Sequence, residues 1–324
     1  MPCLAAALLL VLCASAQAQQ PVKLRRIGYI SGTGTSVNQG PYVEALRQGL
    51  RELGYTEGKH FAIEYRGAEG KLEPVPNLVA ELLQLKVDIL VLPLNSALRI
   101  AHQATKTIPI VMITQVDPVA AGLVNGLAQP GGNLTGIATL ARDLSGKRLE
   151  LLAEVVPRLS RVAILRGANE PVSDVGFKEY ETAARALKIR VQSLEVRGSN
   201  PDLADAFETA VKGRAHAVVT IANIPLFRNS ARIADLAIKN RLPSMHEGGA
   251  WIEAGGLLSY SANDLELFRR AATYVDKIFK GVNPATIPIE QPTKFEFVIN
   301  LKTAKQIGLT IPPNVLARGD RVLK

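Results

Sequence analysis

Residues 87–117, VDILVLPLNSALRIAHQATKTIPIVMITQVD, decide the fold of this chain. Two apolar runs, at residues 88–92 and 108–113, flank a segment of helical character that opens at the polar residues Asn95 and Ser96. This pattern predicts two buried parallel strands joined by a crossover helix. In an open sheet built from such units, ligands bind beyond the carboxyl ends of the strands. We therefore look for functional residues in the loops that follow the strands.

The same alternation of strands and helices continues on both sides of this unit. Before it, strands are predicted at residues 26–30 and 61–65, with helices at 41–53 and 73–85. A glycine-rich turn at residues 130–133 ends this series. A second series follows, with strands predicted at residues 161–165, 190–196, 216–221 and 242–245. The predicted fold class is α/β, with two doubly wound parallel-sheet lobes.

Three extended segments are expected to connect the two lobes as a hinge that permits closure on a ligand. One lobe is expected to comprise residues 22–137 and 261–286, and the other residues 138–260 and 287–324. Three details of the second half are predicted as well: one helix over residues 225–240, a helix capped by Asn200, and a strand at residues 287–289. Asn263 is predicted to cap a helix over residues 264–280.

The amino-terminal segment, MPCLAAALLLVLCASAQAQQ, predicts an export signal. An apolar run at residues 4–12 precedes Ala16-Gln17-Ala18, a small-x-small pattern, so cleavage is expected after Ala18 and the protein is expected in the periplasm. Both cysteines, Cys3 and Cys13, lie in this segment, so no disulfide is expected in the mature chain. A lipid anchor on Cys13 is not expected, because the bulky Leu12 precedes it where a small residue belongs.

Length and charge restrict the class of protein further. The 324 residues, 47% of them apolar, can bury a full core, and the length favours two domains. The formal net charge of +9 indicates a basic, solvated surface, with attraction to an anionic membrane as the alternative. Export argues against nucleic acid as a partner.

Several stretches, taken in order, resemble the ABC-transporter substrate-binding proteins of the type I periplasmic-binding fold, in the family that includes tryptophan- and tyrosine-binding members. They are residues 49–70, 107–136, 147–157, 233–247, 253–260 and 268–313, and they span nearly the whole mature chain. The resemblance implies a monomeric exported receptor that closes on a small solute and delivers it to an ABC permease in the inner membrane. It implies neither an enzyme nor a cofactor.

The resemblance also implies which loops line the ligand cleft. Carried over by position, the candidate ligand-binding residues are Ser31, Thr33, Asn95, Ser96, Thr114, Gln115, Asp117, Asn169, Asn223, Glu247 and Tyr260. Two places depart from the family pattern. Residues 93–96 are Pro-Leu-Asn-Ser where many relatives have a small-Gly-Thr-Pro sequence, and Tyr260 is followed by Ser261 where glycine is usual.

Five of these candidates also have a purely structural interpretation. Asn95 and Ser96 offer backbone N–H groups to a ligand carboxylate in the field of their helix, or they simply cap that helix. Asp117 pairs with a ligand ammonium, or it forms the turn before Pro118. Tyr260 stacks on a ligand ring, or it packs at the hinge. Glu247 binds ligand, or it faces water. Trp251, the only tryptophan, is expected in the core.

No catalytic or metal-binding motif is found in the sequence. The four histidines are far apart without metal-ligand spacing, and neither GxSxG nor SxxK occurs. The favoured ligand is an amino acid or a similar small carboxylate. Two alternatives stay open: a ligand-sensing receptor for a signalling partner, and a sugar or nucleoside receptor, although the aromatic content of 5% weakly disfavours sugars.

Overall fold

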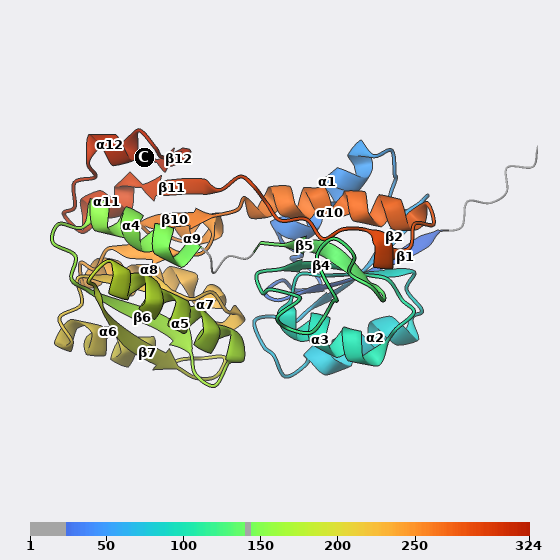
Figure 1. Ribbon diagram of the computed structural model, residues 1–324, viewed down its shortest axis with the longest axis horizontal. Coiled ribbons are helices and arrows are strands. Elements are labelled where there is room, and N and C mark those ends of the chain that lie inside the picture. The colour runs from blue at the N-terminus through green and yellow to red at the C-terminus, as the bar shows by residue number, and fades with distance from the viewer. Residues whose placement is uncertain (1–23, 140–143) are drawn as a thin grey trace, which may run out of the picture.

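The computed structural model describes residues 24–139 and 144–324, so the predicted signal peptide and its cysteines lie outside the described residues. Two α/β lobes lie side by side along the long axis of the molecule (Figure 1). The first contains a parallel sheet in the order β2-β1-β3-β4-β5. Its strands are β1 (Arg25–Ser31), β2 (Phe61–Gly67), β3 (Ile89–Leu92), β4 (Ile110–Thr114) and β5 (Leu134–Ala138). Doubly wound lobes with parallel sheets are thereby confirmed.

Helices cover both faces of this first sheet. Successive residues of β3 point to opposite faces, so Ile89 and Val91 join one buried cluster and Leu90 and Leu92 the other. This explains why β3 is apolar without interruption, as strands buried on both faces are. The covering helices are α1 (Pro41–Glu52) and α10 (Asp264–Phe279) on the first face, with α2 (Val75–Gln84) and α3 (Asn95–Ala104) on the second.

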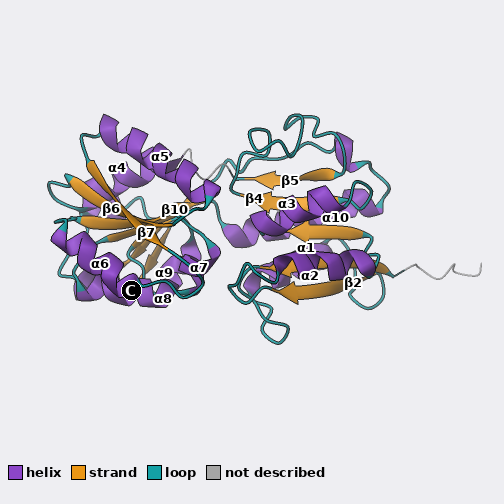
Figure 2. Cartoon of the chain, turned by 90° about the horizontal axis from the view of Figure 1, so that it is seen from below, coloured by secondary structure: helices purple, strands orange, loops and turns teal. Residues whose placement is uncertain are grey.

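The second lobe has the sheet order β12-β11-β10-β9-β8-β6-β7, parallel except where β10 pairs with β11. Its strands are β6 (Arg161–Gly167), β7 (Arg190–Val196), β8 (Ala217–Thr220), β9 (Ser244–His246), β10 (Leu258–Ser261), β11 (Glu296–Asn300) and β12 (Arg321–Leu323). Figure 2 shows helices on both sides of this sheet. They are α4 (Ser145–Val155), α5 (Pro171–Ala186), α6 (Leu203–Lys212), α7 (Ile224–Arg228), α8 (Ser230–Lys239), α9 (Gly249–Glu253), α11 (Leu301–Gln306) and α12 (Pro313–Leu316).

The chain crosses between the lobes three times: after β5, between β10 and α10, and before β11. The second crossing returns α10 to the first lobe, where it lies along α1 (Figure 1). Gly49 permits this contact, since a Cβ atom there would lie 2.3 Å from the carbonyl oxygen of Arg269. The Asn263 side chain caps α10 by accepting a hydrogen bond from the N–H of Glu266, as the sequence predicts.

Three details of the sequence prediction are wrong. Residues 287–289 form no strand; Ile289 and Glu290 donate backbone hydrogen bonds to Leu127 and Gly136, with one isolated bridge from Glu290 to Ile137. Prolines at 288 and 292 remove the N–H groups that a continuous ladder needs. Residues 287–290 therefore pack with the first sheet, and the third crossing lies beyond the expected boundary at residue 287.

The other two corrections concern helices of the second lobe. The helix predicted over residues 225–240 is divided into α7 and α8 at Asn229, whose side-chain amide donates to the carbonyl of Pro225 at 2.8 Å. The cap of α6 is Asp202 instead of Asn200, and its carboxylate accepts a hydrogen bond from the N–H of Asp205. Both errors come from short polar residues whose local hydrogen bonds compete with the helix ladder.

Candidate functional site

The loops after β3 and β4 meet through a direct hydrogen bond between two predicted site residues. The Thr114 hydroxyl donates to the side-chain oxygen of Asn95 at 2.8 Å and accepts from the N–H of Val116 at 3.0 Å. Asn95 begins α3 but makes no capping bond, so its interpretation as a simple cap is not supported. The hydroxyl of Ser96 is buried and has no hydrogen-bond partner among the residues described. The first-turn N–H groups of α3 have no partner within the helix.

The loop after β1 contacts the second lobe. A Cβ atom at Gly32 would lie 3.3 Å from the side chain of Ile224, in α7, and 3.9 Å from that of Leu94. Ser31 closes the loop by accepting a hydrogen bond from the N–H of Gly34 at 3.0 Å, and Thr33 is half-buried within it. This loop therefore forms part of the boundary between the lobes.

Asp117 forms a turn. One of its carboxylate oxygens accepts hydrogen bonds from the N–H of Val119 at 2.9 Å and of Ala120 at 3.2 Å. This is the second of the two interpretations that the sequence allows, in which aspartate before a proline shapes the backbone. The same carboxylate is thus engaged locally and lines neither of the two interlobe cavities described below.

A cavity of about 110 Å³ lies between the lobes on the side of β2 and β7. Asn223 lines it and caps α7 by accepting from the N–H of Leu226 at 2.8 Å, while its amide donates to the carboxylate of Glu170 at 3.0 Å. Gly167 makes room for this pair, because a Cβ atom there would lie 2.4 Å from the Asn223 amide nitrogen. Asn169 adopts a left-handed backbone (φ 59°) in the same loop. The first lobe contributes Gly70, Leu72 and Glu73 to the lining.

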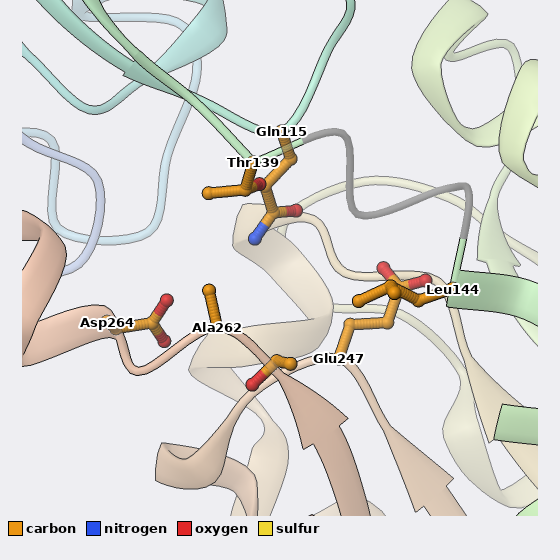
Figure 3. A pocket seen from close by; sticks show the side chains of 7 residues that line it. Gln115, Thr139, Leu144, Glu247, Ala262 and Asp264 are labelled. Carbon is orange, nitrogen blue, oxygen red and sulfur yellow. The ribbon is translucent and has the colours of Figure 1, made fainter. Parts of the chain in front are cut away.

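A second, much smaller cavity of about 10 Å³ lies where the chain crosses between the lobes. Figure 3 shows Gln115 and Thr139 approaching it from the first lobe and Glu247 from the second. Asp264, at the start of α10, also lines it. The remaining lining residues are Leu144, Ser261 and Ala262. Polar groups from both lobes thus converge at the hinge.

Glu247 is held by the protein itself and does not face water, with 9% of its surface exposed. One carboxylate oxygen accepts from the Arg148 guanidinium at 3.0 Å and from the Tyr180 hydroxyl at 3.3 Å. The other accepts from the N–H of Ala222 at 3.0 Å. Glu247 therefore ties the loops after β8 and β9 to helix α4.

The aromatic candidates belong to the core of the second lobe. The Tyr260 ring lies 5.9 Å from that of Phe295 and lines neither cavity, which fits the packing interpretation. Trp251 is 2% exposed and stacks on His246 with ring centres 4.9 Å apart, so its expected place in the core is confirmed. Burial lowers the pKa of His246 to about 3, so this imidazole is neutral.

Two residues near the hinge were not identified from the sequence. Arg148 is completely buried and, besides pairing with Glu247, donates from its Nε to the carbonyl of Tyr260 at 2.8 Å. Asp264 accepts a hydrogen bond from the Tyr42 hydroxyl at 3.5 Å. Burial raises the pKa of Asp264 to about 6, a rise that the Tyr42 hydrogen bond opposes and nearby Glu296 reinforces.

Within the described residues, no group of three or more histidine, cysteine, aspartate or glutamate side chains could hold a metal ion. None of the helices in residues 24–139 and 144–324 combines the length and the hydropathy that a membrane span requires.

Three known proteins show what this chain is similar to. A tyrosine-binding protein of Clostridioides difficile (strain R20291) is 23% identical over 261 residues, 80% of this chain and 74% of that protein. A solved conserved domain protein from Vibrio cholerae is 25% identical, with a TM-score of 0.84, covering 93% of this chain and 100% of that one. An ABC domain in complex with L-Trp from Streptococcus pneumonia is 24% identical, with a TM-score of 0.82 and the same coverage.

These solved structures confirm the type I periplasmic-binding fold. The sequence model of the ABC transporter substrate binding proteins matches residues 39–323, nearly the whole of the described chain. The chain therefore belongs to the family of ABC transporter substrate binding proteins.

Proposed function

We propose that this protein is the solute-binding component of an ABC import system and that it binds an amino acid, or a similar small carboxylate, between its lobes by hinge closure. Proteins of this family are extracytoplasmic, bind small molecules, interact with a permease and are not enzymes. The periplasmic location, cleavage after Ala18, the monomeric state and the lack of affinity for nucleic acid are parts of the proposal.

The observation that carries the proposal is that both lobes line the same interlobe cavities. Gln115 of the first lobe and Glu247 of the second line the cavity at the hinge, and Glu73 and Asn223 line the larger one. A ligand can shift a protein toward a closed state only if its contacts favour that state. A molecule that touches both sets of loops meets this requirement.

Helix α3 supports a carboxylate on the ligand. Its first turn begins beside the loop after β4, where the first N–H groups have no partner within the helix and the helix dipole favours negative charge. The buried hydroxyl of Ser96, without a partner among the described residues, offers one more donor. Buried polar groups in proteins are usually hydrogen-bonded, so this hydroxyl is free to donate to a ligand acceptor. Two similar proteins point in the same direction: one is a tyrosine-binding protein, and the other was solved in complex with L-Trp.

Isothermal titration calorimetry of the mature protein with the standard amino acids, nucleosides and sugars tests this proposal. We expect binding of at least one amino acid, and a melting temperature that rises with its concentration, since a ligand stabilises the state that it binds. Binding of sugars or nucleosides alone would overturn the amino-acid assignment. Mass spectrometry of the exported protein tests cleavage after Ala18, and size-exclusion chromatography with light scattering tests the monomeric state.

A further inference from the structure

Helix α7 has two faces, and each packs against a different lobe. Leu226 is completely buried in the core of the second lobe, and the ring of Phe227 lies 5.7 Å from that of Trp251. Ile224 and Arg228 are four residues apart, so they lie on one face of the helix. Figure 1 and Figure 2 both show α7 on the side of the second lobe that faces the first. The helix therefore belongs to the second lobe but presents two side chains to the first.

Ile224 packs against the core of the first lobe. It contacts the buried cluster on the second face of the first sheet, which includes Ile30 and Leu94. Among the described residues, it is the only one of the second lobe in or against that cluster. Its side chain lies over Gly32, 3.3 Å from the position that a Cβ atom would take there. The missing side chain at position 32 thus leaves the space that Ile224 fills.

Arg228 lies across Gly70, in the loop after β2. A Cβ atom at Gly70 would overlap the Cδ atom of Arg228 and would lie 3.1 Å from its Cγ atom. The aliphatic part of the arginine therefore covers the backbone of the first lobe, as long basic side chains commonly do. Gly70 has a φ of +77°, which glycine adopts without strain. Its N–H donates to the carbonyl of Gly32 at 2.8 Å, so the two glycines form one continuous surface.

Side-chain hydrogen bonds fix both ends of α7. Asn223 accepts from the N–H of Leu226 at 2.8 Å, and its amide donates to the carboxylate of Glu170 at 3.0 Å. At the other end, the amide of Asn229 donates to the carbonyl of Pro225 at 2.8 Å. All of these partners belong to the second lobe. The helix therefore keeps its outward face oriented without help from the first lobe.

We propose that α7 is a clasp, formed by Ile224 and Arg228 against Gly32 and Gly70, that stabilises the closed arrangement of the lobes without a ligand. Every atom of this contact belongs to the protein, so it favours closure whether or not a solute is bound. The affinity for any ligand is then scaled by the fraction of molecules that the clasp holds closed. The inference goes beyond the proposed function, because it concerns the ligand-free protein and applies to any solute.

The test measures the distance between the lobes in the ligand-free mature protein. Residues 19–324 contain no cysteine, so Gln84→Cys on α2 and Val211→Cys on α6 place one spin label on each lobe at an exposed position. Double electron-electron resonance gives the distribution of distances. We expect a population at the distance that separates the two positions in this structure. A distribution that lies entirely at longer distances would overturn the clasp, and this result needs no clasp variant to fold.

Variants of the labelled protein then test the two side chains. Ile224→Ala should lower the ratio of closed to open molecules about tenfold, because it removes several carbon atoms from an apolar contact. Arg228→Ala should lower it less, since this side chain is largely exposed. Leu187→Ala and Arg232→Ala are the matched controls at exposed positions of the second lobe, and neither should change the ratio. Thermal unfolding shows whether each variant is folded. If folded Ile224→Ala keeps the ratio of its control, the clasp is wrong.

Calorimetry with L-tyrosine and L-tryptophan separates the clasp from the proposed function. In Ile224→Ala, the dissociation constants of both probes should rise by one common factor, the factor by which the closed fraction falls. A rise for one probe alone would assign Ile224 to the ligand site and overturn the clasp, because a clasp acts on all ligands alike. If no amino acid binds the wild type, the proposed function fails, while the ligand-free distances still decide the clasp.

Discussion

The guanidinium of Arg148 lies 3.0 Å from the carboxylate of Glu247, and both side chains are buried, with exposed fractions of 0% and 8%. This pair links helix α4 to the loop after β9, and through the N–H of Ala222 to the loop after β8. Arg148 also holds the carbonyl of Tyr260, just before the second crossing. One buried ionic network beside the hinge therefore holds helix α4, the loops after β8 and β9, and the end of β10 together.

Replacing Arg148 by methionine should destabilise the protein severely. The substitution leaves the Glu247 carboxylate buried without its cation, which typically costs about 3–5 kcal/mol of unfolding free energy. Urea denaturation followed by circular dichroism measures the loss. Arg318→Met is the control, since it removes an exposed pair with Glu154 and should change stability by about 1 kcal/mol or less. Equal losses in the two variants would contradict the role of the buried pair.

The sequence could not reveal this network, although it predicted most of the strands around it. An arginine on an amphipathic helix is ordinarily solvated, and nothing in residues 147–157 shows that Arg148 turns inward. Its partner Glu247 is 99 residues away in the chain. Asp264 was similarly hidden, because an acid after the cap of α10 is already explained by the helix dipole. Only the folded structure shows that Arg148 pairs with Glu247 and that Asp264 lies beside the hinge.

Strands buried on both faces could be predicted from the local sequence alone, because β3 and β4 are uninterrupted apolar runs. The loops after two neighbouring parallel strands lie at the same edge of the sheet, and Asn95 and Thr114 meet there. Whether a given loop side chain is directed into a cavity or into a local turn depends on one or two hydrogen bonds. Asp117 binds its own turn, while Gln115, two residues earlier, reaches the hinge cavity.

The stability of the ligand-free protein should depend on pH through Asp264. Its pKa is about 6 in the folded protein against 3.8 in the unfolded chain, so the folded state binds the proton more tightly. The stabilisation is complete below pH 3.8 and is lost as pH rises toward 6. Within residues 24–139 and 144–324, the titratable groups that influence the pKa of Asp264 are Tyr42, from α1, and Glu296, from β11, and neither carries a positive charge.

The variant Asp264→Asn removes the carboxyl group and with it this pH dependence of stability, so comparing it with the wild type tests the prediction. The difference in unfolding free energy between Asp264→Asn and the wild type should grow in favour of the variant from pH 4 to pH 6 and level off above it. Thermal or urea denaturation at a series of pH values gives that difference. A difference that stays constant across the series would show that Asp264 titrates normally.

Gly136 in β5 should not tolerate alanine. Its φ of +135° is accessible mainly to glycine, and a Cβ atom there would lie 2.1 Å from the carbonyl oxygen of Met112 in β4. Because the neighbour is backbone in a buried sheet, we expect Gly136→Ala to cost about 3–5 kcal/mol. Gly122→Ala is the control: its φ is also positive, at +67°, but no atom lies within 4 Å, so about 1–2 kcal/mol is expected from backbone strain. Similar losses in chemical denaturation would contradict the steric argument.

A bulky residue at Gly32 should hold the lobes apart. A Cβ atom there already meets Ile224 of the second lobe at 3.3 Å, so the ring of Gly32→Phe would occupy the space that α7 fills when the lobes are in contact. The ring lies between the lobes and in the core of neither, so each lobe should stay folded while closure becomes unfavourable. The apparent affinity equals the intrinsic affinity multiplied by the fraction of molecules able to close. A free-energy penalty on closure of about 1.4 kcal/mol therefore lowers the affinity tenfold.

Small-angle X-ray scattering and calorimetry measure the two consequences. With a saturating amino acid ligand, Gly32→Phe should keep a larger radius of gyration than the wild type, and its dissociation constant should rise tenfold or more. Val37→Phe is the matched control, because it adds a ring to the same loop at a side chain that is 94% exposed, where nothing opposes it. If both variants close and bind like the wild type, the contact between Gly32 and Ile224 does not limit closure, and the hinge must be governed by the crossings alone.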